Sequence, residues 1–105
     1  CVLYVGNGIV IGNNVSIAAN CVLAPTNHEF ENRNMLHQMQ GFRPSRGGIR
    51  IEDDVWIGAT SVLLDGATLE VGCVVGACSL VRGSTDPYGI YAGNPLVKRG
   101  ERIEK

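Results

Sequence analysis

The sequence predicts an all-β protein built as a parallel β-helix, in which short strands wind into coils that stack on one another. The main observation is a six-residue repeat whose first position is always Ile, Leu or Val. These types make up only 28 of the 105 residues, so ten agreements by chance are very improbable. A period of six fits neither strand alternation nor a helical face, and it indicates a solenoid of short strands and turns. The repeat positions are Val5, Ile11, Ile17, Leu23, Ile51, Ile57, Leu63, Leu69, Val75 and Val81.

Turn-forming residues occupy regular places within the same repeat. Glycine or alanine follows the aliphatic residue in six repeats, as in Ile57-Gly58. Pairs such as Asn13-Asn14, Asp53-Asp54 and Asp65-Gly66 separate the aliphatic positions. These residue types accept the backbone conformations of tight turns that bulkier residues resist. The pattern therefore predicts a short strand, a turn, and another short strand.

Composition and charge narrow the classes of function. Nine basic and ten acidic residues give a net charge of −1, which offers neither a basic face for nucleic acid nor a polybasic membrane patch. No apolar run approaches the roughly 20 residues that span a bilayer. The 105 residues fit one domain, and a domain this small gains stability from partner subunits.

The four cysteines indicate neither a disulfide framework nor a metal site. Cys1, Cys21, Cys73 and Cys78 form no C-x-x-C pair, and no histidine cluster accompanies them. We expect small, buried residues in a reducing compartment, and hence a cytoplasmic protein without a bound metal. Because the chain begins at Cys1 without a methionine, we also expect further residues upstream.

The segment that interrupts the repeat is a candidate for part of the functional site. From Leu23 to Ile51 the spacing is 28 residues, which is not a multiple of six, so a loop of about residues 26–50 is inserted. It contains both histidines and four arginines, and loops this long are more often functional than not. We expect a substrate lid, with a tolerated insertion as the alternative. The repeat is lost again after residue 83, and residues 84–105 are expected to form a C-terminal tail or cap.

Three motifs together resemble a known family. Residues 23–28 read Leu-Ala-Pro-Thr-Asn-His, residues 56–59 read Trp-Ile-Gly-Ala, and residues 92–95 read Ala-Gly-Asn-Pro before a basic stretch. The combination resembles the hexapeptide-repeat acyltransferases, in particular the galactoside, maltose, xenobiotic and polysaccharide O-acetyltransferase group. The resemblance covers nearly the whole chain. It implies a left-handed parallel β-helix with three hexads in each triangular coil, although parallel crossovers in general are right-handed.

The resemblance implies that His28 is the catalytic general base. Attack of an alcohol on a thioester needs removal of the hydroxyl proton, and histidine is suited to this because its ordinary pKa lies near 6.5. The oxyanion that forms needs fixed donors, for which a backbone N–H near Gly58 and Ala59 is our candidate. An ordinary solvated loop residue is the alternative for His28 and the stronger expectation for His37. Glu29 and Glu31 remain open as partners of a histidine or of a sugar.

The resemblance also implies residues that bind acetyl-CoA as cosubstrate. Trp56 would lie beside the pantetheine arm, with simple packing as its alternative, and Ala59 stands where some relatives carry serine. Relatives often carry Thr-Lys in place of Arg82-Gly83, so Arg82 would replace that lysine. A solvated basic tail is the alternative for the C-terminal cations. The expected cofactor-binding residues are Trp56, Gly58, Ala59, Ala77, Arg82, Gly83, Lys98 and Arg99.

A homotrimer is implied as well, with His28 of one chain facing Trp56 of the next across each active site. A γ-type carbonic anhydrase shares the fold but needs three zinc-binding histidines, whereas this chain has two. A non-catalytic β-helix scaffold or binding module remains open, as does N-acetylation of an amino-sugar. Nothing in the sequence identifies the acceptor.

Overall fold

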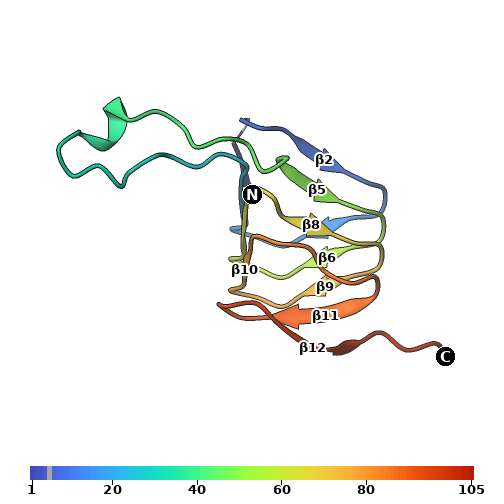
Figure 1. Cartoon of the computed structure of the whole chain (residues 1–105). Coiled ribbons are helices and arrows are strands. Elements are labelled where there is room, and N and C mark those ends of the chain that lie inside the picture. The colour runs from blue at the N-terminus through green and yellow to red at the C-terminus, as the bar shows by residue number, and fades with distance from the viewer. Residues whose placement is uncertain (5) are drawn as a thin grey trace.

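The computed structural model describes residues 1–4 and 6–105 as a small β-prism from which one long loop projects (Figure 1). The described part contains twelve strands and a single 3-10 helix, η1. The strands are β1 (Val2–Leu3), β2 (Ile9–Ile11), β3 (Ser16–Ile17), β4 (Val22–Ala24), β5 (Ile49–Ile51), β6 (Trp56–Ile57), β7 (Val62–Leu64), β8 (Thr68–Leu69), β9 (Val74–Val75), β10 (Leu80–Val81), β11 (Gly89–Ala92) and β12 (Val97–Glu101).

Three sheets form the three sides of the prism. The first side has the order β1-β4-β7-β10, the second β2-β5-β8, and the third β3-β6-β9-β11-β12. All neighbouring strands are parallel except β11 and β12, which are antiparallel. Each strand thus pairs with the strand one coil further on. The predicted parallel β-helix is confirmed.

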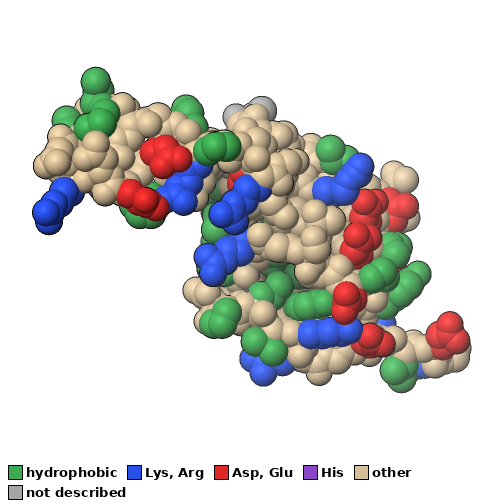
Figure 2. All heavy atoms as spheres, viewed as in Figure 1, with side chains coloured by type: hydrophobic (Ala, Val, Ile, Leu, Met, Phe, Trp, Pro, Cys, Tyr) green, Lys and Arg blue, Asp and Glu red, His purple; other side chains and the backbone are tan. Residues whose placement is uncertain are grey.

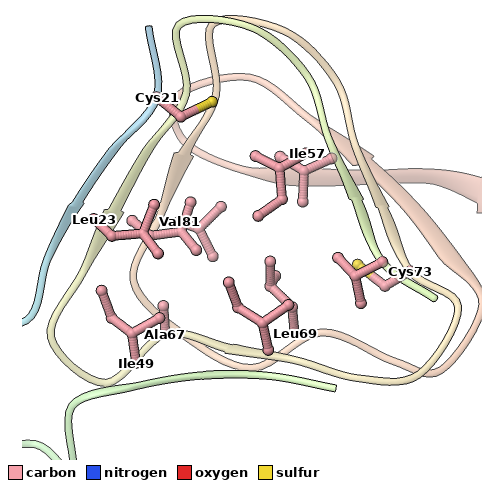
Figure 3. Close-up of a cluster of buried hydrophobic side chains, with 12 residues drawn as sticks. Cys21, Leu23, Ile49, Ile57, Ala67, Leu69, Cys73 and Val81 are labelled. Carbon is pink, nitrogen blue, oxygen red and sulfur yellow. The ribbon is translucent and has the colours of Figure 1, made fainter. Parts of the chain in front are cut away.

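The repeat positions form the core of the prism. In the second to fourth coils, every one of them is at most 1% exposed, and Figure 3 shows such side chains converging inside the triangular outline of the backbone. Burying an aliphatic side chain contributes about 1.5–3 kcal/mol to stability, so these stacked columns hold the coils together. The buried repeat residues are Leu23, Ile51, Ile57, Leu63, Leu69, Val75 and Val81.

The first coil departs from the predicted spacing. Leu3 pairs with Leu23, twenty residues on, whereas Leu63 pairs with Val81, eighteen residues on. Val5, which the repeat makes the first aliphatic position, lies outside the described residues. Ile11 is 40% exposed because this coil has a neighbour on one side only.

The stacking continues beyond the last recognisable hexad. Val75 pairs with Tyr91, sixteen residues on, so the final coil is shorter by two residues and the sequence period is lost there. Within the expected tail of residues 84–105, β11 therefore extends the third side, and β12 folds back on β11 at the end of the stack.

Residues 26–48, here called the arm, leave the prism between the first and second sides (Figure 1). The arm ends at residue 48 because β5 begins at Ile49. Its two legs pair at the stem: Glu29 N–H donates to Gly41 O at 3.0 Å and Arg43 N–H to Asn27 O at 2.8 Å. The 3-10 helix η1 (His37–Met39) lies further out. No helix in the described part of the chain has the length and hydropathy of a membrane span.

Candidate functional site

His28 lies on the outgoing leg of the arm, close to the prism. It forms an antiparallel bridge with Phe42, and the two ring centroids are 4.6 Å apart. The His28 N–H donates to Asn27 Oδ1 at 2.9 Å, and its carbonyl accepts from Arg43 Nε at 3.2 Å. Among the described residues, none makes a hydrogen bond to the imidazole of His28. The backbone is thus fixed while a ring nitrogen stays available to take up a proton, as a general base requires.

A cavity of about 620 Å³ opens between the stem of the arm and the first coil. His28 and Phe42 line one wall, and Tyr4 and Asn7 line another. This volume falls in the range of small-molecule sites. A second hollow of about 570 Å³ is lined by His28 and His37, so both histidines of the chain border one region on the arm.

The arm is fastened to the prism by a buried carboxylate that sequence reasoning interpreted only as part of a turn. Asp65 is 7% exposed and accepts from Gly48 N–H and Arg46 N–H, both at 2.8 Å, on the returning leg. Asn7 Nδ2 donates to Asp65 at 3.2 Å and to Pro25 O at 2.8 Å, at the start of the outgoing leg. Asp65 and Asn7 therefore hold both legs at their roots. The spacing of the sequence gives no signal of these bonds, because it does not show which N–H groups face Asp65.

Gly58, Ala59 and Ala77 lie together on the edge that joins the third side to the first side of the next coil, here called the alanine edge. A Cβ at Gly58 would lie 2.5 Å from the backbone N of Ala77, so the coils approach too closely there for any side chain. The Gly58 N–H already donates to Val75 O at 2.7 Å. Of the two candidate oxyanion donors, only the Ala59 N–H has no acceptor among the described residues.

Trp56 lies on the third side, two residues before Gly58 in the chain. Its side chain is 57% exposed although it is the largest apolar side chain in the protein. Its strand neighbours are Ser16 and Val74. Packing within this chain therefore does not explain why so large a side chain occupies this position. Its exposed aromatic surface is free to contact a ligand or a second subunit.

The expected phosphate-binding cations are dispersed. Arg82 and Gly83 follow β10 and line a cavity of about 240 Å³ with Asn94 and Pro95. Lys98 forms ion pairs with Asp86 at 3.0 Å and Glu101 at 2.7 Å, and these carboxylates raise its pKa above the ordinary value. A phosphate would have to displace them.

Arg99 is exposed, and its guanidinium lies 3.8 Å from the position that a Cβ at Gly93 would take. The Leu80 N–H donates a hydrogen bond to Gly93 O at 3.2 Å. This bond places Gly93 on the alanine edge, beyond Ala77. Arg99 thus lies near the end of a row of small residues. Within one chain, His28 and Arg82 share one edge of the prism, while Trp56, Ala59, Ala77 and Arg99 belong to the third side and the alanine edge.

Comparison with known proteins shows the family to which the chain belongs. The family described as the hexapeptide repeat of succinyl-transferase matches residues 1–25 and 48–81, which omits the arm. The chain belongs to the hexapeptide-repeat acyltransferase family. Its fold is accordingly a left-handed parallel β-helix.

Sequence relatives of this acyltransferase-family chain are much longer. It is 34% identical to a probable acetyltransferase of Mycobacterium tuberculosis over 83% of this chain and 28% of that protein. It is 38% identical to a chloramphenicol acetyltransferase of Agrobacterium fabrum over 72% of this chain and 34% of that protein. The chain thus spans about a third of the length of these relatives.

Solved structures of acyltransferases are also similar to this chain. A maltose O-acetyltransferase from Clostridium difficile superposes with a TM-score of 0.79 at 29% identity, over 91% of this chain and 49% of that one. The N-acyltransferase AntD from Bacillus cereus, in complex with dTDP-4-amino-4,6-dideoxyglucose and coenzyme A, gives 0.83 at 25% identity, over 97% and 57%. Both an O- and an N-acyltransferase are therefore similar in structure.

Proposed function

We propose that the chain is the β-helix domain of an acetyl-CoA-dependent O-acetyltransferase acting on a sugar or related hydroxyl acceptor. The observation that carries the proposal is His28, whose backbone is held at the stem of the arm while its ring nitrogens stay free beside a cavity of about 620 Å³. Relatives named as acetyltransferases support the acetyl donor.

In the proposed reaction, His28 removes the proton from the acceptor hydroxyl as its oxygen attacks the thioester carbonyl of acetyl-CoA. The carbonyl oxygen gains negative charge, which the free Ala59 N–H would stabilise. The tetrahedral intermediate then collapses and the C–S bond breaks. The departing thiolate of coenzyme A takes the proton from His28, which returns to its neutral form.

The cofactor would lie along the alanine edge, with its pantetheine arm against Trp56, Ala59 and Ala77. The small side chains leave room for an extended chain, and Arg99 at this edge would receive the phosphates. Arg82 and Gly83 lie on the arm edge of the same prism, so they would contribute to this cofactor only from a neighbouring subunit. Lys98 would contribute only after losing its pairs with Asp86 and Glu101.

A complete site requires more than one copy of the chain. His28 and Trp56 belong to different parts of one prism, so a second subunit would bring the alanine edge to the arm of the first. We therefore propose a homotrimer with one active site between each pair of subunits. Analytical ultracentrifugation should give three times the monomer mass, and a monomer with full activity would refute this arrangement.

Transfer to an amine is the second candidate, favoured by the likeness to the Bacillus cereus N-acyltransferase. The two reactions differ in their products, because acetyl esters hydrolyse in mild alkali whereas acetamides persist. Mass spectrometry of the products from maltose and from glucosamine, before and after alkali, distinguishes them.

The decisive test of the proposed function is the variant His28→Ala, with His37→Ala as its matched control. Loss of a general base lowers turnover about 10²–10⁴-fold, while the dissociation constant of acetyl-CoA should stay within a few-fold of the wild-type value. Release of the coenzyme A thiol measures turnover, and calorimetric titration measures binding. Unchanged turnover in His28→Ala would exclude His28 as the base.

A further inference from the structure

Another cavity on the arm side of the prism contributes only Arg82 to the proposed reaction. Its volume is about 360 Å³, and it lies where the arm joins the prism. Figure 2 shows Lys and Arg side chains gathered at this junction. We call it the arginine cavity; the lining residues that bear on the inference are Thr26, Asn27, Arg43, Arg46, Asp65 and Arg82.

The three arginines of this cavity differ in their partners. Arg43 is held on the arm, with Glu31 at 3.2 Å and Glu29 at 4.0 Å, and its guanidinium lies 4.5 Å from the ring centroid of Phe30. In contrast, the guanidinium groups of Arg46 and Arg82 have no carboxylate partner and no hydrogen bond among the described residues.

Among the described residues that line the cavity, Asp65 is the one carboxylate, and its oxygens already accept hydrogen bonds. Asp65 accepts from the N–H groups of Arg46 and Gly48 and from the side chain of Asn7, and it is 7% exposed. It therefore has little capacity left to pair with the guanidinium of Arg46 or Arg82. Two uncompensated arginines beside an amide and a hydroxyl form a favourable site for a phosphate group, which arginine binds through two parallel hydrogen bonds.

The arginine cavity adjoins the cavity of His28. Thr26 lines both of them, so a ligand that passes Thr26 would reach the arginines at one end and His28 at the other. We propose that the acceptor carries a phosphate group, as a sugar phosphate does, and that Arg46 binds this group with help from Arg82. This inference rests on the proposed function, because His28 must act on the same molecule.

The phosphates of coenzyme A are the other source of the same chemistry. Arg82 lines both the arginine cavity and the cavity with Gly83, so it is in reach of either ligand. Arg46 lines the arginine cavity and lies on the arm beside Gly66. A variant of Arg46 therefore distinguishes the two ligands. Loss of Arg46 should weaken binding of a phosphorylated acceptor and leave binding of the cofactor unchanged.

The test is calorimetric titration of glucose 1-phosphate, with glucose as the uncharged probe, into the wild-type chain and Arg46→Gln. Arg33→Gln is the matched control, since it removes the same charge from an exposed part of the arm. Losing a charged hydrogen-bond donor should weaken binding of glucose 1-phosphate about 10-fold or more, with glucose unchanged and Arg33→Gln within two-fold of wild type. Equal affinities in Arg46→Gln and Arg33→Gln would overturn the proposal.

Titration of coenzyme A and of dephospho-coenzyme A identifies the source of the phosphate. We expect Arg46→Gln to bind both as the wild type does. If it weakens coenzyme A alone, the cavity receives the cofactor's 3′-phosphate and the proposal is wrong. Binding of glucose 1-phosphate does not require acetyl transfer, so failure of this subsite and failure of the His28 assignment give separate results.

Discussion

The attachment of the arm to the prism gives a prediction whose size follows from the structure. In Asp65→Asn, one carboxylate oxygen becomes an NH₂ group, which cannot accept from the backbone N–H groups that now donate to it at 2.8 Å. At least one backbone N–H, that of Gly48 or of Arg46, then loses its acceptor and with it a hydrogen bond to a charged group, which costs about 2–3 kcal/mol. For a domain of this size the thermal midpoint should fall by roughly 10 °C.

Asp53→Asn is the matched control for this variant. Asp53 is exposed and accepts one backbone bond, from Asn13 N–H at 2.7 Å, on an edge without an inserted loop. The remaining amide oxygen can still accept that bond, so we expect a loss below about 1 kcal/mol.

Thermal and urea unfolding followed by circular dichroism measure both variants, and amide hydrogen exchange at Arg46 and Gly48 locates the effect. Faster exchange at these amides in Asp65→Asn would show that the returning leg has been released. Equal stability losses in the two variants, within 0.5 kcal/mol, would refute the role of Asp65 in fastening the arm.

Three further predictions concern the prism. Gly58→Ala should lower the free energy of unfolding by about 1–3 kcal/mol, since its Cβ meets the Ala77 backbone; unchanged stability in urea would contradict this close approach. Trp56→Ala should weaken acetyl-CoA binding, because the indole is 57% exposed and would contact the pantetheine arm in the proposed complex; equal dissociation constants would show that Trp56 has no contact with the cofactor. Iodoacetamide should modify the exposed Cys78 before the buried Cys73, whose thiol pKa is raised by burial; mass spectrometry of the native protein would reveal the opposite order.

The fold could be predicted because, in a solenoid, the residues that face the core recur at a fixed short spacing in the sequence. Ile57, Leu63 and Leu69 each face the core from a different side of one coil, so a six-residue count suffices to find them. The prediction failed to extend where the coil length changes. Tyr91 pairs with Val75 after sixteen residues instead of eighteen. A search for a fixed six-residue period therefore does not detect this shorter coil.

The site was less accessible to sequence reasoning. His28 and Trp56 could be named from the motifs around them, and the structure adds that they belong to separate parts of one prism. In contrast, the role of Asp65 depends on the path by which the arm returns, because its N–H partners are 17 and 19 residues away in sequence. Long-range hydrogen bonds of this kind do not follow the six-residue repeat, so the sequence pattern does not predict them. The same holds for the arginine cavity, whose walls come from the arm and two coils.

The measurement that tests the central claim most directly is the thermal midpoint of the chain with and without millimolar acetyl-CoA. A ligand at about 100 times its dissociation constant stabilises the native state by roughly 2.7 kcal/mol, which corresponds to about 10 °C or more in a domain of this size. An acyltransferase domain with a cofactor groove at the alanine edge should show this rise, and Trp56→Ala should reduce it. An unchanged midpoint would contradict acetyl-CoA binding and, with it, the proposed role of His28.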